Sequence, residues 1–540
     1  DSPDQQALVN ETRDADAFNW GYDPYHFTAP EGSYSTDPNS PIRIREFRSA
    51  VQALNEAGLR VVMDVVYNHT NAAGQNERSV LDRIVPGYYH RLNETGRVES
   101  STCCSNTATE HAMMEKLMLD SLRTWATAYR VDGFRFDLMG HHMLSNMIDV
   151  RAMLDSLTPE ADGVDGQAIY VYGEGWDFGE VAGNARGVNA TQLNIAGTGI
   201  GVFNDRLRDA VRGGSPFSNP QEQGFSTGLY TAPNTWDERT SDDQRARLLE
   251  YGDWIRVGLA GSLADYTFEN ANGDMVTGAD ISYNGNPAGY TADPQENINY
   301  VSAHDNETLW DVVQLKAADD VDLAQRIRMD NLALSVAALG QGVPFFHAGD
   351  DILRSKSMDR DSYNSGDWFN SIDWTLQDNN WGHGLPIEDK NGGNWGIMGP
   401  LLATPALDAT QADMELQNAL FREWLEIRHS SPLFRLETAA DIIDRLTFFN
   451  TGVDQMPGVI GMRLSDTAGA DLDPSNQDIV VIFNATPDAQ TLTVDGLGDG
   501  YVLHPVLAES ADAVVRGAAY DGAGAFTVPA RTTAVFVLPQ

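Results

Sequence analysis

The feature that most constrains the fold is an alternation of short apolar patterns with longer helical patterns between about residues 42 and 350. Residues 59–67 (LRVVMDVVY) are nearly all apolar and rich in β-branched side chains, as in a strand buried on both faces. The segment before it has apolar residues at helical spacing and ends at Gly58, a candidate C-cap. This alternation predicts βα units around a parallel sheet.

The alternation of strand and helix patterns continues with a helix predicted at 110–130. Six strands are expected in all, at 59–67, 131–138, 168–173, 198–203, 298–303 and 343–347. A TIM-type (β/α)8 barrel has eight strands, and the chain opens on loop-like sequence. We therefore expect an α/β fold of this barrel type, with the first two strands missing from this chain, which looks like a fragment.

The sequence changes character after about residue 432. Segments such as DIVVIFNA and RTTAVFVLP are short strands separated by Gly, Asp and Pro turns. This pattern predicts a C-terminal antiparallel β-sandwich at 433–540 after a catalytic barrel at 1–432. Within the barrel, 353–400 is predicted to be a long, aromatic, Asn/Gly-rich active-site loop, since loops of that length are usually functional or disordered.

The charge balance limits the partners. The 540 residues include 36 Lys+Arg and 78 Asp+Glu, which gives a formal net charge of -42. Such a surface repels nucleic acid and anionic membranes, so a neutral or cationic substrate is expected. No apolar stretch approaches the length of a membrane span. We expect a monomer.

The two cysteines, Cys103 and Cys104, are neighbours. Two cysteines cannot make a disulfide framework, and no Cys/His spacing typical of a zinc site is present. The residues alone leave two alternatives open, a pair of free thiols or a vicinal disulfide that would imply an oxidising compartment.

Polar side chains end four of the predicted strands, and strand ends at the C-terminal face are where barrels carry their chemistry. The four pairs are Asn68 and His69, Arg135 and Asp137, Glu174 and Trp176, and His304 and Asp305. A single carboxylate would be weak evidence, since most of the acids must be solvated. Acids that end buried apolar strands are costly unless compensated, which favours a functional site.

The neighbours of these acids suggest roles. Arg135 and Asp137 are two apart on one strand and point to the same face, so the guanidinium is expected to keep Asp137 ionised, as a nucleophile needs. Glu174 lies beside Trp176, and partial desolvation is expected to raise its pKa toward that of a working acid. Such a pairing suits acetal hydrolysis, with retention of configuration if the carboxylates lie about 5–5.5 Å apart.

Three further side chains are interpreted from their positions. Asp305 is expected to bind sugar hydroxyls and hold the ring distorted. His69 and His304 are expected to donate hydrogen bonds to the sugar, although a lone histidine is more often a core residue. Asp64 lies in mid-strand and is interpreted as structural, supporting either Arg135 or the strand geometry. The residues support no catalytic metal site.

Four short segments resemble the conserved regions of the α-amylase superfamily. These are DVVYNHT at 64–70, GFRFDLM at 133–139, YGEGWD at 172–177 and VSAHDN at 301–306. The segment at 18–36 (FNWGYDPYHFTAPEGSYST) resembles the NWGYDP signature of type I pullulanases and limit dextrinases. The resemblance covers essentially the whole chain.

The resemblance implies roles residue by residue. Asp137 would be the nucleophile, Glu174 the acid/base and Asp305 the transition-state stabiliser. The substrate contacts would be made by Tyr22, His69, Arg135, His304 and Trp176. The implied reaction is endo-hydrolysis of α-1,6-glucosidic bonds in pullulan, limit dextrins and amylopectin fragments, with retention.

The resemblance also bears on cofactors and location. It implies no catalytic cofactor, and structural calcium whose ligands the sequence does not identify. The Cys103–Cys104 pair resembles that of secreted bacterial pullulanases, which favours the vicinal disulfide and secretion, whereas the limit-dextrinase likeness favours a plastid or intracellular setting. The alternatives are an α-1,4-acting amylase or isoamylase, a branching enzyme, and a catalytically silent glucan-binding homologue.

Overall fold

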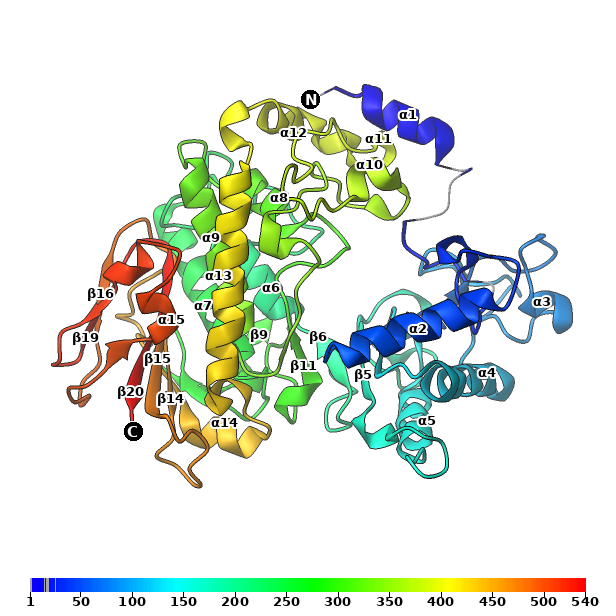
Figure 1. Ribbon diagram of the computed structural model, residues 1–540, viewed down its shortest axis with the longest axis horizontal. Coiled ribbons are helices and arrows are strands. Elements are labelled where there is room, and N and C mark those ends of the chain that lie inside the picture. Colours follow the sequence, from blue (N-terminus) through cyan, green and yellow to red (C-terminus); the bar gives the residue numbers. More distant parts are fainter. Residues whose placement is uncertain (1, 14, 16–18, 25) are drawn as a thin grey trace. The chain divides into compact units, whose positions relative to one another are not determined.

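The computed structural model describes residues 2–13, 15, 19–24 and 26–540 (Figure 1). The chain divides into two compact units. One is Gly21–Phe203, and the other joins Asp1–Trp20 to Asn204–Gln540.

The unit Gly21–Phe203 is built on four parallel strands with helices between them (Figure 1). The strands, in sheet order, are β1 (Val62–Val65), β4 (Gly133–Phe136), β5 (Tyr170–Gly173) and β6 (Gly201–Phe203). The main helices are α2 (Ile42–Glu56), α4 (Ala112–Thr124), which runs on into a π-helical turn (Trp125–Tyr129), and α5 (Leu144–Asp155). All four residues of β4 are buried, so the polar residues at its end stand on a rigid support.

The first of these strands differs from its prediction. Val62 is 42% exposed and Leu59 is 57% exposed, so this segment is not buried on both faces. Among the described residues, β4 is the sole strand paired with β1, and a strand with one neighbour leaves its other side open. The apolar composition identified the strand correctly but not its burial.

The second unit contains the other two predicted barrel strands. β11 (Asn297–Asn299) pairs in parallel with β12 (Val343–Pro344). The main helices here are α6 (Asp205–Arg212), α7 (Ser241–Leu259), α8 (Leu309–Lys316), α9 (Leu323–Leu339) and α13 (Gln411–Ser430). All six predicted strands are therefore confirmed, each shorter than predicted, and β11 begins one residue earlier.

The predicted long loop at 353–400 contains three short helices, α10 (Gly366–Asn370), α11 (Glu388–Asn391) and α12 (Trp395–Leu402). Its apolar side chains share a buried cluster with α8 that includes Leu353, Met358 and Met398. The segment also contacts the N-terminal helix α1 (Asp4–Thr12), where the Glu388 N–H donates to Gln6 Oε1 at 3.2 Å. The loop is thus a packed subdomain rather than an irregular segment.

The C-terminal region is antiparallel, as predicted. One sheet has the order β13 (Leu446–Phe449), β14 (Val459–Ser465), β15 (Asn476–Asn484), β20 (Thr532–Pro539) and β17 (Val502–Leu503). The other has the order β16 (Gln490–Thr493), β19 (Ala525–Val528) and β18 (Ala519–Tyr520). Val480 and Phe536 of the first sheet share a core with Leu492 and Phe526 of the second. The domain boundaries 1–432 and 433–540 stay a prediction.

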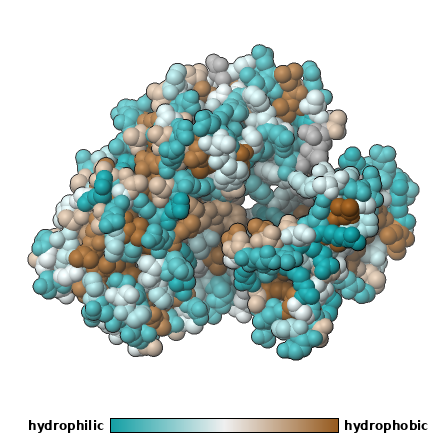
Figure 2. Space-filling model, viewed as in Figure 1, coloured by the Kyte–Doolittle hydropathy of each residue, from teal (hydrophilic) through white to brown (hydrophobic). Residues whose placement is uncertain are grey.

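The remaining elements are short. They are β2 (His69–Thr70), α3 (Leu81–Ile84), β3 (Ser105–Asn106), β7 (Thr267–Glu269), β8 (Met275–Thr277), β9 (Ser282–Tyr283), β10 (Asn286–Pro287), α14 (Ala439–Arg445) and α15 (Pro505–Ala508). On the face drawn in Figure 2, hydrophilic side chains predominate and hydrophobic ones form scattered patches. Within the described residues, no helix has the length and apolar character needed to cross a membrane.

Candidate active site

Two carboxylates follow directly from the ends of adjacent strands in the unit Gly21–Phe203. Asp137 comes after β4, and its N–H donates to the Val65 carbonyl of β1 at 3.0 Å. Glu174 comes after β5, and its N–H donates to the Phe136 carbonyl of β4 at 3.1 Å. Both backbones are therefore fixed by the ladder, so their side chains start from neighbouring points at one sheet edge.

Arg135 joins these carboxylates. Its Nη2 lies 2.9 Å from Glu174 Oε1, and its Nη1 lies 3.3 Å from Asp137 Oδ1 and 2.8 Å from Asp64 Oδ1. The Tyr22 hydroxyl donates to Asp64, and the guanidinium lies 5.7 Å from the Tyr22 ring centroid. Arg135 is 7% exposed, so one buried cation faces three carboxylates. Asp64 thus contacts Arg135, and its structural role stays a prediction.

The protonation of this group differs from the prediction. Burial, followed by the charge of Glu174, raises the pKa of Asp137 to about 8, although Arg135 and the amide of Asn68 oppose the rise. The predicted ionised Asp137 is therefore wrong for the ligand-free protein. Arg135, which also pairs with the more exposed Asp64, cannot neutralise two buried carboxylates, so the Asp137–Glu174 pair retains a proton near neutral pH.

The two carboxylates differ in the hydrogen bonds that they accept. Glu174 accepts at both oxygens, from Arg135 at Oε1 and from the Leu138 N–H at Oε2, 2.9 Å away. Asp137 has one short contact, from Asn68 Nδ2 to Oδ2 at 2.8 Å, and the longer one to Arg135. Glu174 thus accepts two short hydrogen bonds, whereas Asp137 accepts one short and one longer contact.

The loops after β4 and β5 are closely packed on each other. The Gly140 N–H donates to the Glu174 carbonyl at 2.9 Å, and a Cβ at Gly140 would lie 2.1 Å from the Trp176 carbonyl oxygen. Leu138, between the two loops, has a left-handed backbone with φ 40°. Such a conformation is costly for a non-glycine residue and is held here by its neighbours. Glycine at 140 thus permits the carboxylates to stand side by side.

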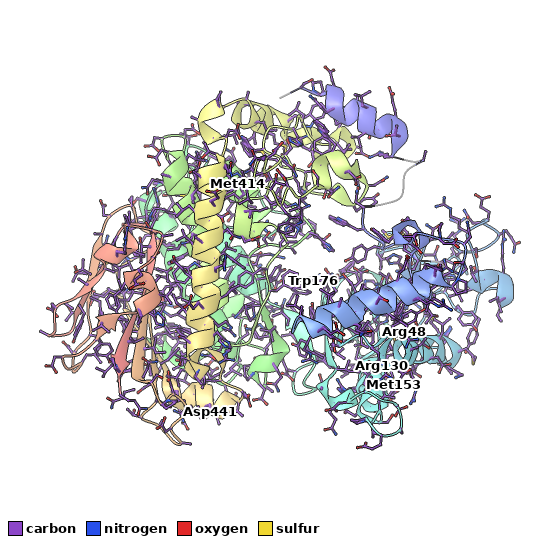
Figure 3. All side chains as sticks on the ribbon, viewed as in Figure 1. Arg48, Arg130, Met153, Trp176, Met414 and Asp441 are labelled. Atoms are coloured by element: carbon purple, nitrogen blue, oxygen red, sulfur yellow. A yellow bond between two sulfur atoms is a disulfide. The ribbon has the colours of Figure 1, made fainter. Side chains whose placement is uncertain are left out.

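The predicted sugar contacts Tyr22 and His69 belong to the same cluster. His69 is buried, and its Nε2 lies 2.6 Å from the Tyr22 carbonyl oxygen. Burial lowers the pKa of His69, so the neutral imidazole is favoured. Trp176 follows Glu174 and is partly exposed, labelled in Figure 3. The structure thus brings together Tyr22, His69, Arg135, Asp137 and Glu174.

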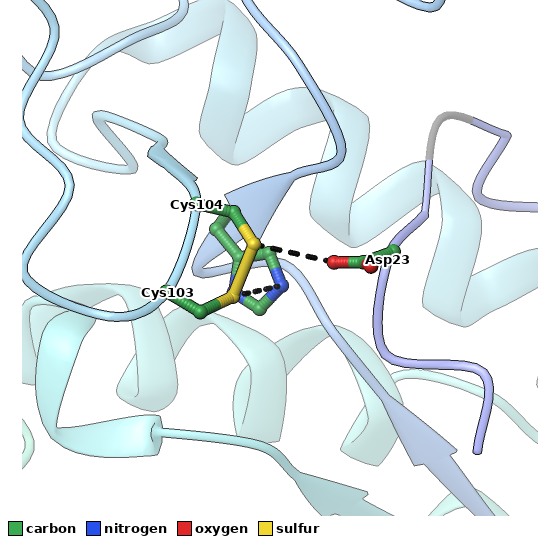
Figure 4. A group of neighbouring side chains, drawn as sticks. Asp23, Cys103 and Cys104 are labelled. Atoms are coloured by element: carbon green, nitrogen blue, oxygen red, sulfur yellow. Dashed lines mark hydrogen bonds between the residues drawn. A yellow bond between two sulfur atoms is a disulfide. The ribbon is translucent and has the colours of Figure 1, made fainter. Parts of the chain in front are cut away.

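Cys103 and Cys104 form a vicinal disulfide, which decides between the two alternatives left by the residues (Figure 4). Cys103 Sγ lies 3.6 Å from His69 Nε2, and Cys104 Sγ lies 3.2 Å from Asp23 Oδ1. The pair borders the cluster through His69.

His304 and Asp305 belong to the other compact unit, in the segment that follows β11. The His304 ring stacks on Trp20 with 4.4 Å between the centroids, and His304 Nε2 lies 3.9 Å from Asp305 Oδ2. The buried Lys356 donates from Nζ to the carbonyls of His304 and Asn306, both at 2.7 Å. This ammonium fixes the backbone on both sides of Asp305.

Sequence reasoning missed several members of these clusters. Asn68 stood at the end of its strand beside His69 but was assigned no role. Lys356 left no signal, because it acts through backbone carbonyls of a segment about fifty residues away. Asp23 contacts the disulfide through the fold, with no spacing that a motif would reveal.

Comparisons with known proteins agree with this architecture. Residues 376–539 match the family described as alpha-1,6-glucosidases, pullulanase-type, C-terminal. "Pullulanase 1, chloroplastic" of Arabidopsis thaliana is 50% identical over 99% of this chain and 57% of its own length. A pullulanase of Klebsiella pneumoniae is 45% identical over 100% of this chain and 49% of its own. A crystal structure of the maltotriose complex of PulA from that organism matches with TM-score 0.93 and 45% identity, covering 100% of this chain and 57% of that one.

The βα units with carboxylates at their strand ends, followed by an antiparallel β-region, define a protein of the α-amylase superfamily. Within it, the chain belongs to the pullulanase family. The chain spans about half the length of the curated relatives it matches.

Proposed function

We propose that this chain carries the catalytic machinery of a starch-debranching glycosidase, which hydrolyses α-1,6-glucosidic bonds in pullulan, limit dextrins and amylopectin fragments. The observation that carries the proposal is the Arg135 guanidinium held between Asp137 and Glu174. Two carboxylates sharing one proton are the minimum equipment for double-displacement cleavage of an acetal. The family membership supports the α-1,6 bond as the target.

In this proposal Asp137 attacks the anomeric carbon while Glu174 protonates the glycosidic oxygen that leaves. A water molecule then attacks the glycosyl–Asp137 ester, with Glu174 taking its proton, so the configuration is retained. The ligand-free cluster stores the proton on Asp137. The attack therefore requires that this proton leave Asp137 and that Glu174 carry a proton. Arg135, which contacts both carboxylates, balances the negative charge on either one.

Asp305 is proposed as the third carboxylate, which stabilises the distorted ring. Its place in the rigid segment after β11, with Lys356 on the flanking carbonyls, supports a role that needs precise position. Tyr22, His69, His304 and Trp176 are proposed as sugar contacts. We also propose that the parallel strands belong to a (β/α)8 barrel.

The test compares two glucans that differ in their linkages. Wild-type chain should release reducing ends from a branched limit dextrin and leave linear amylose, which has only α-1,4 bonds, uncut. Asp137→Asn and Glu174→Gln should each abolish release while binding to the dextrin persists. Cleavage of amylose would favour the α-1,4-acting alternative, and unchanged turnover in both variants would refute the assignment.

Three further proposals concern the setting. The disulfide supports a site of action in an oxidising compartment, so we propose secretion, with a plastid as the alternative suggested by the Arabidopsis relative's name. We propose a monomer, with any calcium structural rather than catalytic. Thiol trapping of the native protein tests for the disulfide, gel filtration tests for the monomer, and a calcium chelator tests for structural calcium. Chelation should lower thermal stability before it affects turnover.

A further inference from the structure

Four side chains with metal-binding atoms converge beside the catalytic cluster. They are Asp23, His69, Cys103 and Cys104, and one potential ligand atom from each lies within 4.8 Å of all the others (Figure 4). They come from three separate segments, and within the described residues no other group of three or more His, Cys, Asp and Glu is so close. Cys103 is exposed, whereas His69 is buried, so the group is open to solvent on the sulfur side.

The oxidised form leaves one contact in this group poorly matched. Asp23 Oδ1 lies 3.2 Å from Cys104 Sγ, yet a disulfide sulfur has no proton to donate. A thiol, or a cation shared by the two atoms, would satisfy this contact.

We propose that reduction of the Cys103–Cys104 disulfide converts this group into a zinc site with two thiolates, one imidazole and one carboxylate as ligands. A dithiol reductant supplies two electrons and two protons and becomes a disulfide, and the protein gains two thiols. Zn²⁺ then displaces the two thiol protons and binds both sulfurs, His69 Nε2 and one Asp23 oxygen.

The present distances fit this coordination. Zinc binds sulfur at about 2.3 Å and nitrogen or oxygen at about 2.0 Å, so tetrahedral ligand atoms lie about 3.3–3.8 Å apart. The Cys103–His69 contact of 3.6 Å and the Cys104–Asp23 contact of 3.2 Å are close to those separations. The required changes are opening of the S–S bond and rotation of His69 away from the Tyr22 carbonyl, which its Nε2 now faces.

Zinc at this position would act on catalysis, and this consequence rests on the proposed function. His69 would coordinate the metal through Nε2 and could not donate to a sugar. Loss of one such hydrogen bond lowers hydrolysis by roughly tenfold or more. The group would thus inhibit the enzyme only when reduced and metal-loaded.

The experiment incubates the chain with ZnCl₂, with or without a phosphine reductant, which is oxidised to its oxide with oxygen from water. Bound zinc is counted after gel filtration. We expect about one zinc per reduced chain and none per oxidised chain. With Co²⁺ as the probe, reduced chain should show sulfur-to-cobalt charge-transfer absorption. Cys103→Ser/Cys104→Ser and Asp23→Asn should weaken retention, whereas the surface control Asp149→Asn should not.

Several results would overturn the proposal. These are no zinc on the reduced chain, equal retention by the oxidised chain or the double serine variant, and loss of the native circular dichroism spectrum on reduction. Zinc counts do not depend on turnover, so they remain decisive if the chain fails to cleave glucans. Zinc binding without inhibition of an active chain would sustain the site and remove its effect on catalysis.

Discussion

Replacement of Asp137 by asparagine should stabilise the ligand-free protein, by an amount that grows with pH. Burial and the neighbouring Glu174 raise the pKa of Asp137 from 3.8 to about 8. Between those values the folded chain keeps a proton that the unfolded chain has lost, so this group makes the fold less stable as pH rises. An amide resembles the protonated acid and has no such dependence.

The magnitude follows from the shift. From pH 4 to pH 7 the difference spans about three pKa units, or about 4 kcal/mol at most. For a unit of this size that corresponds to about 10 °C in the unfolding midpoint. Differential scanning calorimetry of wild type and Asp137→Asn should give similar midpoints at pH 4 and a widening gap in favour of the variant up to pH 7.

The matched control is Asp149→Asn on the exposed face of α5, for which no widening is expected. A gap that stays constant with pH would refute the reasoning. A variant less stable than wild type at pH 7 would do so more strongly, since it would mean that Arg135 stabilises an ionised Asp137 in the ligand-free protein.

Three other substitutions test the supports of the site. Lys356→Met removes both hydrogen bonds to the carbonyls on either side of Asp305. In steady-state kinetics it should lower kcat for limit dextrin about 10–100-fold with little change in KM, and Lys356→Arg should recover part of the loss. Gly140→Ala forces a Cβ against the Trp176 carbonyl and should destabilise the fold by about 1–3 kcal/mol, measured as a lower thermal midpoint. Arg91 pairs with Glu110 at 2.8 Å and with Glu180 at 3.0 Å. Arg91→Met leaves these two partly buried carboxylates without their cation and should cost about 3–5 kcal/mol, a loss that shrinks at acidic pH as the carboxylates become protonated.

The sequence predicted the parts of the fold that depend on local pattern. Alternating apolar periods located all six parallel strands. The even spacing of Arg135 and Asp137 predicted that their side chains point the same way, and the two side chains are in contact at the end of β4. The prediction that β1 is buried on both faces was wrong. Burial depends on the elements that surround a strand, and the composition of the strand does not encode them.

The protonation of the cluster was beyond sequence reasoning for a related reason. A motif pairs Arg135 with Asp137, but the structure adds Asp64 and Glu174 to the same guanidinium. Burial, together with the charge of Glu174, outweighs Arg135 and reverses the sign of the pKa shift at Asp137. Contacts through backbone carbonyls, such as those of Lys356, leave no residue pattern at all.

The central claim is that the carboxylates on Arg135 serve cleavage of α-1,6 bonds, and the products formed from pullulan test it most directly. Pullulan alternates two α-1,4 bonds with one α-1,6 bond. The chain should release maltotriose as the sole end product, resolved by anion-exchange chromatography, and Glu174→Gln should release none. Panose or a random series of oligosaccharides from the wild-type chain would contradict the account.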